Sequence, residues 1–299
     1  MIKQTLCFSN PAYLSLRNGQ MVIDTRSDRG VVTRPVEDIG LVVIESHSVT
    51  VSAALLSALL DNNAAVMVCD KKHLPSGLLL PQAGNSLLTE RTRHQLNASL
   101  PLRKQLWQQT VSAKIQNQGR LLRQVNPKES ECMTQWARTV RSGDPDNLEA
   151  RAAVFYWKNL FVGRPDFLRG DDEDSINTLL NYGYAILRGI IARAIVGAGL
   201  IAHVGLFHSN KYNAYCLADD LMEPYRPYVD KKVIDILKSY DKIDELTPEI
   251  KRHLLSIPVI DVEIGGLKRP LLIAASITAT SLTKCFSGEQ RRLSYPEMP

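Results

Sequence analysis

The amino-acid sequence predicts an α+β protein, in which a small N-terminal β-rich, sandwich-like domain precedes a larger all-helical domain. Up to about residue 80, short segments rich in β-branched and aromatic residues alternate with turn residues. Beyond PQAGNS (81–86), apolar residues recur at helical spacing. The length of 299 residues also exceeds one average domain. We therefore expect a β-rich domain at 1–80, a linker at 81–90 and a helical domain at 91–299.

The first domain is predicted to consist mainly of short strands. Asn18-Gly19 supplies the residues with positive φ that a tight hairpin needs. The stretch from Ser48 changes to helical spacing through Leu55 and Leu59, so one helix interrupts the strands. The expected strands cover 5–8, 13–17, 21–24, 31–34, 41–45 and 64–70.

The second domain follows a helical period. From Leu102 to Leu122, apolar residues fall on one helical face and basic residues lie between them. Asp144-Pro145 has the composition of a helix start, opening a helix through ARAAVFYWKNLF. Further helices are expected over 174–193, much of 194–204, 229–240, 248–255 and 269–286.

Composition indicates an ordinary soluble protein, with 44% hydrophobic and 22% charged residues. The first residues lack a basic stretch followed by a long apolar run, so we expect a cytoplasmic protein. The most apolar stretch, 185–207, carries Arg188 and Arg193, which favours a buried helix over a membrane span. The five cysteines form no C-x-x-C pair, so a zinc ribbon or a disulfide framework is not expected.

One segment is strongly basic. Between Arg91 and Lys128 there is no Asp or Glu, and such a segment creates a positive potential that can hold nucleic-acid phosphates. A solvated helix face is an equal alternative. The basic residues are Arg91, Arg93, Arg103, Lys104, Lys114, Arg120, Arg123 and Lys128.

Several common enzyme signatures are missing from the sequence. It contains no P-loop, no G-x-G-x-x-G after a strand, no H-E-x-x-H and no G-x-S-x-G. These absences weaken the NTPase, dehydrogenase, zinc-protease and serine-hydrolase interpretations.

Acidic residues in two D-x-x-E patterns are the main candidates for chemistry. Asp220 and Glu223 lie in CLADDLMEPYRPYVDKK (216–232), where the pattern is typical of a helix capping box. Glu149 closes a second such pattern that begins at Asp146, although Asp144 competes for the same helix start. If Asp144 is the cap, the Glu149 carboxylate is free for another role.

A metal site is the alternative to capping. Asp220 and Glu223 would project from one helical face, and a divalent cation relieves the repulsion between close carboxylates. His208 ends HVGLFH, where an apolar helix breaks into a polar loop, and a structural role is its simpler interpretation. Glu149, His208 and Glu223 together would offer oxygen ligands and one imidazole, a set that suits Mg²⁺ or Mn²⁺.

GLFH (205–208) followed by DLMEPYRP (220–227) resembles the CRISPR adaptation integrase, the CRISPR-associated endonuclease subunit that inserts new spacers into the host array. The resemblance extends through both domains, and the length and motif style are most similar to the compact form found beside a single large RNA-guided nuclease. The other segments that resemble this family are PVEDIGLVVIES (35–46), AAVMVCDKKHLPSGLLLP (64–81) and NTLLNYGYAILRG (177–189).

The resemblance implies a helical catalytic domain whose metal ligands are Glu149, His208 and Glu223, with Asp220 as a helper acid. The implied reaction is attack by a DNA 3′-hydroxyl on a phosphodiester at the repeat boundary. The implied partners are double-stranded DNA, a second copy of the chain, and a dimer of a small ferredoxin-like protein that completes a heterohexamer.

Two other functions remain open at the level of the sequence: a metal-dependent nuclease that uses water as the nucleophile, and a DNA-binding scaffold without activity. Arg and Lys side chains suit phosphate contacts, and ion pairs with nearby acids are the alternative. Aromatic rings can stack on an unpaired DNA end, although packing in the core is their simpler role. The candidate DNA contacts are Lys211, Arg226, Arg103, Lys104, Lys114, Tyr182 and Tyr184.

Overall fold

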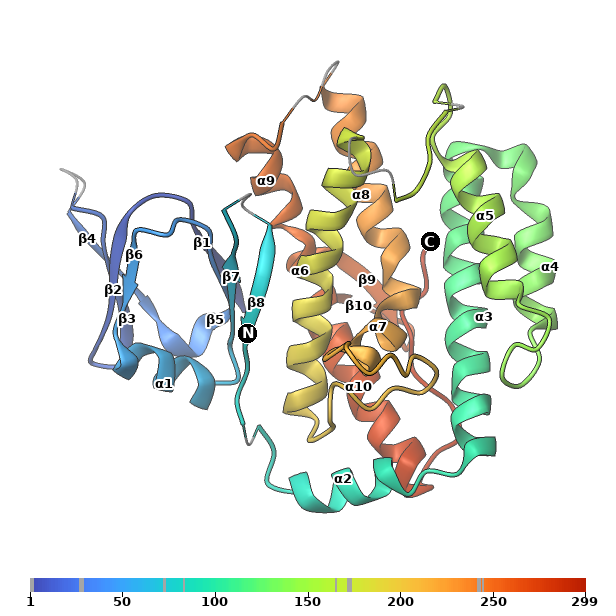
Figure 1. Ribbon diagram of the computed structural model, residues 1–299, viewed down its shortest axis with the longest axis horizontal. Helices are drawn as coiled ribbons and strands as arrows, with labels where there is room; N and C mark the ends of the chain where they lie inside the picture. Colours follow the sequence, from blue (N-terminus) through green and yellow to red (C-terminus); the bar gives the residue numbers. More distant parts are fainter. Residues whose placement is uncertain are drawn as a thin grey trace.

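The computed structural model describes residues 3–26, 30–71, 74–82, 84–164, 166–170, 174–240, 243 and 245–299. Its N-terminal strands form a β-rich region beside a larger helical region (Figure 1). The predicted fold class is therefore confirmed.

The N-terminal region is a sandwich of two four-stranded sheets, with orders β1-β5-β7-β8 and β4-β3-β2-β6. Helix α1 begins after Ser52, whose side chain accepts a hydrogen bond from the Leu55 amide. The elements are β1 Gln4–Phe8, β2 Ala12–Arg17, β3 Gln20–Asp24, β4 Val31–Pro35, η1 Val36–Asp38, β5 Ile39–Ile44, β6 Val49–Val51, α1 Ala53–Asp61, β7 Ala65–Cys69 and β8 Pro75–Leu79.

Strands β5 and β7 are buried on both faces. Val42 and Val66 point into the sandwich core, whereas Leu41, Val43 and Met67 belong to the core of the helical region. Because side chains alternate along a strand, these two strands need apolar residues at nearly every position. The uninterrupted apolar segments in this part of the sequence thus mark the wall between the two cores.

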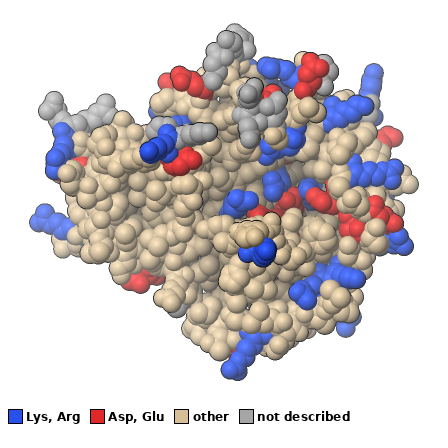
Figure 2. All heavy atoms as spheres, in the orientation of Figure 1, with Lys and Arg blue, Asp and Glu red and all other residues tan. Residues whose placement is uncertain are grey.

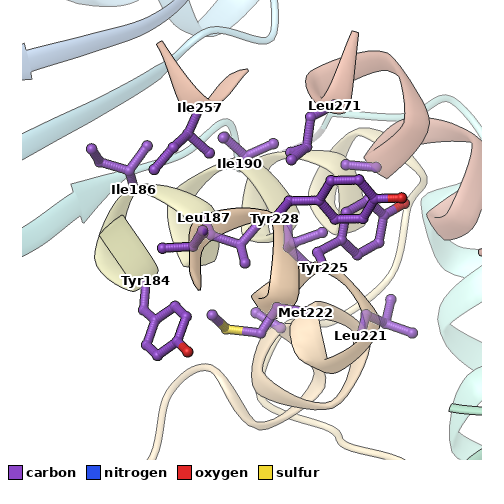
Figure 3. Close-up of a cluster of buried hydrophobic side chains, with 14 of the residues drawn as sticks. Tyr184, Ile186, Leu187, Ile190, Leu221, Met222, Tyr225, Tyr228, Ile257 and Leu271 are labelled. Atoms are coloured by element: carbon purple, nitrogen blue, oxygen red, sulfur yellow. The ribbon is translucent and has the colours of Figure 1, made fainter. Parts of the chain in front are cut away.

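The helical region is built around α6, which lies between the sheet wall and the other long helices (Figure 1). Figure 3 shows part of its core, where Leu187 and Ile190 of α6 pack near Tyr225 and Leu271. The elements are α2 Leu88–Leu96, α3 Leu100–Val125, η2 Pro127–Glu129, α4 Glu131–Thr139, α5 Leu148–Leu160, α6 Ser175–Gly197, α7 Cys216–Met222, η3 Glu223–Tyr225, α8 Arg226–Ser239, α9 Pro248–Leu254, η4 Ile257–Val259, β9 Asp261–Ile264, β10 Leu267–Pro270 and α10 Leu271–Ser287.

Among the described helices, α6 is the one long and apolar enough to cross a membrane, but 78% of its most apolar window is buried inside the fold. This burial is that of a core helix, as the sequence indicated.

Several details differ from the sequence prediction. The second domain is not entirely helical, because Gly265-Gly266, both with positive φ, turn a short β9–β10 hairpin. Helix α6 ends at Gly197 instead of continuing towards residue 204, and Gly199 has a φ of +74°. Helix α2 begins within the predicted linker at 81–90, and strands β6 and β8 were not predicted.

Candidate functional site

One face of α3 runs along the candidate site. Arg103, Trp107, Thr110, Lys114 and Asn117 recur at intervals of three or four residues, so their side chains point in one direction. Lys114 and Asn117 are buried, at 6% and 1% exposure. Part of the segment predicted as a basic DNA-binding face is therefore polar but buried inside the helical region.

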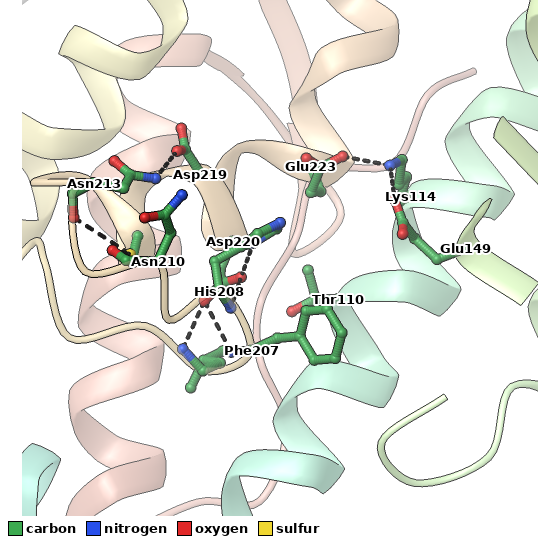
Figure 4. A network of polar contacts seen from close by, with 12 residues as sticks. Thr110, Lys114, Glu149, Phe207, His208, Asn210, Asn213, Asp219, Asp220 and Glu223 are labelled. Atoms are coloured by element: carbon green, nitrogen blue, oxygen red, sulfur yellow. Dashed lines mark hydrogen bonds and ion pairs between the residues drawn. The ribbon is translucent and has the colours of Figure 1, made fainter. Parts of the chain in front are cut away.

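The ammonium group of Lys114 joins two glutamates from other helices. Its Nζ lies 2.5 Å from Oε1 of Glu149 and 2.6 Å from Oε2 of Glu223 (Figure 4). Burial alone would raise the pKa of Glu223, but Arg226 and Lys114 hold it at about 2. Burial lowers the pKa of Lys114, and the two carboxylates more than reverse this. Lys114 and Glu223 are therefore both charged at neutral pH.

The Glu149 side chain does not cap the start of α5, because Asp144 takes that role. The carboxylate of Asp144 accepts hydrogen bonds from the backbone amides of Leu148 and Glu149, both at 2.9 Å. Asp146 instead forms an ion pair with Arg141 at 2.5 Å. The capping box predicted from Asp146 is therefore not formed, and the Glu149 side chain is available to Lys114.

The second D-x-x-E pattern is not a capping box either. Asp220 lies inside α7, and Glu223 follows the last residue of that helix. Pro224 comes next, and its carbonyl oxygen accepts a hydrogen bond from the Asn117 amide at 2.8 Å. Arg226 Nε donates to the second oxygen of Glu223 at 2.9 Å. The predicted helix-start role of Asp220 is therefore wrong, and Glu223 is held from both sides.

The fully buried carboxylate of Asp220 organises the GLFH loop. It accepts hydrogen bonds from the backbone amides of Leu206, Phe207 and His208, at 2.6, 3.1 and 3.2 Å. Its Oδ1 also lies 2.6 Å from Nδ1 of His208. This hydrogen bond raises the pKa of His208. Gly205 fits here because a Cβ would lie 2.7 Å from Asp220 Oδ2 and closer still to the backbone oxygen of His208.

Aromatic packing attaches this loop to α3. The ring of Phe207 stacks on Trp107, with centroids 4.5 Å apart and planes 2° from parallel. The imidazole of His208 meets Trp107 edge-on at 5.8 Å. The histidine is therefore held beside the same helix face that carries Lys114 (Figure 4).

The structure brings the predicted site residues together in two groups. Glu149 and Glu223 converge on one position, which Lys114 occupies, and His208 pairs with Asp220. Among the residues that the structure describes, no group of three or more His, Cys, Asp or Glu is arranged to hold a metal ion. The donor chemistry nevertheless fits a divalent cation, because two carboxylates already share one positive charge and Asp220 binds one imidazole nitrogen, the usual support of a metal-ligating histidine.

Two predicted aromatic DNA contacts are not available for stacking. Tyr182 is fully buried, and Tyr184 is 7% exposed with its hydroxyl bonded to Asp230. Both residues pack in the core, which was their alternative role. Lys114 is not a free phosphate ligand either, because its ammonium is paired with two glutamates. Arg226 is likewise paired with a glutamate and stands over the ring of Tyr184 at 4.6 Å.

The other predicted basic contacts lie nearer the surface. Lys104 and Lys211 are exposed, and Arg103 is half-buried. Arg103 and Lys211 line a cavity of about 550 Å³ formed with the loop 203–214. Figure 2 shows basic and acidic side chains close together on this face of the helical region. The surface around the site is therefore suited to a charged ligand.

Sequence reasoning missed two features of this site. It assigned Lys114 to the surface, because the pairing with Glu149 and Glu223 depends on three separate elements. It also missed Asp219, which binds Arg188 Nε at 2.7 Å and accepts a hydrogen bond from Asn213 at 2.7 Å. Arg188 within an apolar stretch was a usable signal for a polar partner, although its side chain is 45% exposed and so does not depend on that partner for burial.

Comparisons with known proteins show the family of the chain. The sequence model for "CRISPR associated protein Cas1" matches residues 6–247. A CRISPR-associated endonuclease Cas1 from Neisseria meningitidis serogroup C (strain 8013) is 39% identical over 256 residues, covering 85% of this chain and 83% of the relative.

Solved structures share the fold. A casposase bound to integration product matches with a TM-score of 0.81 and 21% identity, over 98% of this chain and 92% of the casposase. A Cas6-RT-Cas1–Cas2 complex matches with a TM-score of 0.71 and 18% identity, over 97% of this chain and 35% of the matched chain. The fold is thus that of the casposase and Cas1 class of proteins. The chain belongs to the CRISPR-associated Cas1 family, which confirms the resemblance seen in its motifs.

Proposed function

We propose that this chain is a divalent-metal-dependent DNA integrase of the cytoplasm. It inserts new spacers into a CRISPR array by attack of a DNA 3′-hydroxyl on a phosphodiester at the repeat boundary. The observation that carries this proposal is the convergence of Glu149 and Glu223 on one cation position. Two similar proteins support it, because the Neisseria relative is named an endonuclease and the casposase was solved bound to integration product.

The site residues would act as follows. Mg²⁺ or Mn²⁺ held by Glu149, Glu223 and His208 would neutralise the charge that gathers on the phosphoryl oxygens and the leaving 3′-oxygen. Asp220 fixes the ring of His208, and a proton on Nδ1 leaves the Nε2 lone pair free. Arg226 keeps the Glu223 carboxylate oriented and ionised.

DNA would approach over the cavity beside the GLFH loop. Arg103 and Lys211 line this cavity, and Lys104 is exposed on the same helix as Arg103. We propose that these three side chains contact phosphates, which gives affinity that depends on salt and little on base sequence.

A strand-transfer assay tests the proposal. The protein is incubated with Mn²⁺, a short duplex bearing free 3′-ends and a supercoiled plasmid that carries a repeat. We expect joined products from the wild type and none from Glu223→Gln, whereas Asp235→Asn, which changes an exposed acid on α8, keeps activity. Absence of joining by the wild type, even with the small partner supplied, would contradict the proposal.

A donor duplex with blocked 3′-hydroxyls separates integration from hydrolysis. Integration stops when the hydroxyl is blocked, because that oxygen is the nucleophile. A nuclease that uses water continues to cut. Persistent cutting without joining would therefore favour the nuclease alternative.

We also propose an assembly in which the chain forms homodimers, and two homodimers flank a dimer of a small ferredoxin-like partner. The solved Cas6-RT-Cas1–Cas2 complex, which contains a chain of this fold, supports a Cas2-type partner. Light scattering of the purified chain, alone and with the partner, tests both steps. A monomer at assay concentration, or no complex with the partner, would contradict this assembly. The neighbouring large RNA-guided nuclease stays a prediction from the motifs.

A further inference from the structure

Lys114 stands where the two candidate metal-binding carboxylates meet. One oxygen of Glu223 is bonded to Arg226, and the other, Oε2, lies 2.6 Å from the Lys114 ammonium. Apart from the Lys114 ammonium, this buried Oε2 has no hydrogen-bond donor among the described residues, so the contact with Lys114 compensates its burial. Oε1 of Glu149 contacts the same ammonium at 2.5 Å.

A divalent cation bound between the two carboxylates would use these same oxygen atoms. Mg²⁺ binds oxygen at about 2.1 Å, closer than the ammonium lies, so an ion between the two carboxylates would overlap with the Lys114 nitrogen. Ammonium and metal are therefore alternative occupants of one position.

Charge balance leads to the same conclusion. Glu149 pairs with Lys114, and Glu223 pairs with Lys114 and Arg226, so this partly buried cluster of two acids and two bases is close to neutral. A divalent ion added beside both basic groups would leave an uncompensated positive charge in a partly buried site, which is unfavourable. The flexible four-carbon stem of lysine allows the ammonium to leave without movement of the helix.

We propose that Lys114 is a resident counter-cation that holds Glu149 and Glu223 together in the metal-free protein, and that the divalent ion binds by displacing it. This inference rests on the proposed metal-dependent function and adds a residue that controls metal affinity. Lys114 is a positioning residue, since it acts through the two glutamates.

Calorimetric Mn²⁺ titration of the full chain tests the exchange. Lys114→Gln removes the competing charge, so we expect it to bind Mn²⁺ at least about tenfold more tightly than the wild type. Its melting temperature without metal is expected to fall, and to rise on Mn²⁺ addition by more than that of the wild type. Lys158→Gln, an exposed lysine on α5, the helix that carries Glu149, is the matched control and should bind as the wild type does.

The titration distinguishes the two claims. Equal or weaker binding by Lys114→Gln, when the binding is lost in Glu223→Gln, overturns the exchange and leaves the metal site standing. Absence of binding that depends on Glu223 in both the wild type and Lys114→Gln overturns the metal part of the proposed function, and the exchange with it.

A measurement on the wild type keeps the inference testable if Lys114→Gln does not fold. Limited acetylation followed by mass spectrometry reports the accessibility of each lysine. Lys114 should be protected without metal and labelled several-fold faster with saturating Mn²⁺, whereas the exposed Lys158 is labelled equally in both. Unchanged protection of Lys114 in protein that has bound Mn²⁺ would overturn displacement.

Discussion

Replacing Asp220 by asparagine tests the account of the GLFH loop. Oδ2 of Asp220 accepts from the amides of Leu206 and Phe207, and Oδ1 accepts from the amide and ring of His208. Asparagine keeps one oxygen and turns the other into an NH₂ donor that faces these donors, so two hydrogen bonds to a charged acceptor are lost. At about 1.5 kcal/mol each, the free energy of unfolding should fall by about 3 kcal/mol.

Urea unfolding followed by tryptophan fluorescence measures this change. All three tryptophans, Trp107, Trp136 and Trp157, lie in the helical region, so the signal reports on the part that contains the site. Hydrogen exchange should show lost protection at the amides of residues 206 and 207. Asp235→Asn is the control, because its exposed ion pair with a lysine should contribute less than about 1 kcal/mol. A loss in Asp220→Asn no larger than in this control would refute the reasoning.

Three further predictions concern the surroundings of the site. Burial raises the pKa of Asp230 to about 6, above its unfolded value, so its ionisation destabilises the fold as pH rises. Between pH 4 and 7 the unfolding free energy should fall by about 2 kcal/mol relative to Asp230→Asn, and parallel pH curves would contradict this. Asn117→Ala removes buried hydrogen bonds to the turn after Glu223 and to the C-terminal segment. Urea unfolding should therefore show that the free energy of unfolding falls by about 2–4 kcal/mol, whereas the exposed Gln124→Ala should lower it little. Phe207→Leu should lower the free energy of unfolding by about 1 kcal/mol and change the fluorescence emission of Trp107, its stacking partner. Unchanged emission would argue against the stack.

The sequence by itself determined the division into a β-rich and a helical region and most of the elements within them. These features depend on local properties: alternation in strands, a period near 3.6 in helices, and turn residues such as Asn18-Gly19. Motif resemblance also identified the family, which the comparisons confirm. The sequence did not reveal the β9–β10 hairpin, because short segments satisfy helical and extended patterns about equally well. It did not reveal the end of α6 at Gly197 either, because apolar residues continue beyond that glycine.

Only the tertiary structure decided what each site residue does. Whether Asp144 or Asp146 caps α5 depended on Arg141, which pairs with Asp146 and leaves capping to Asp144. Asp220 looked like a helix cap, but the fold brings the GLFH loop onto its carboxylate.

Lys114 is the clearest case, because a lysine in a basic segment is expected at the surface. Packing of α3 against α5 and η3 places two carboxylates around it. Sequence patterns report local backbone preference and burial, whereas charge pairing between distant segments is created when the helices pack.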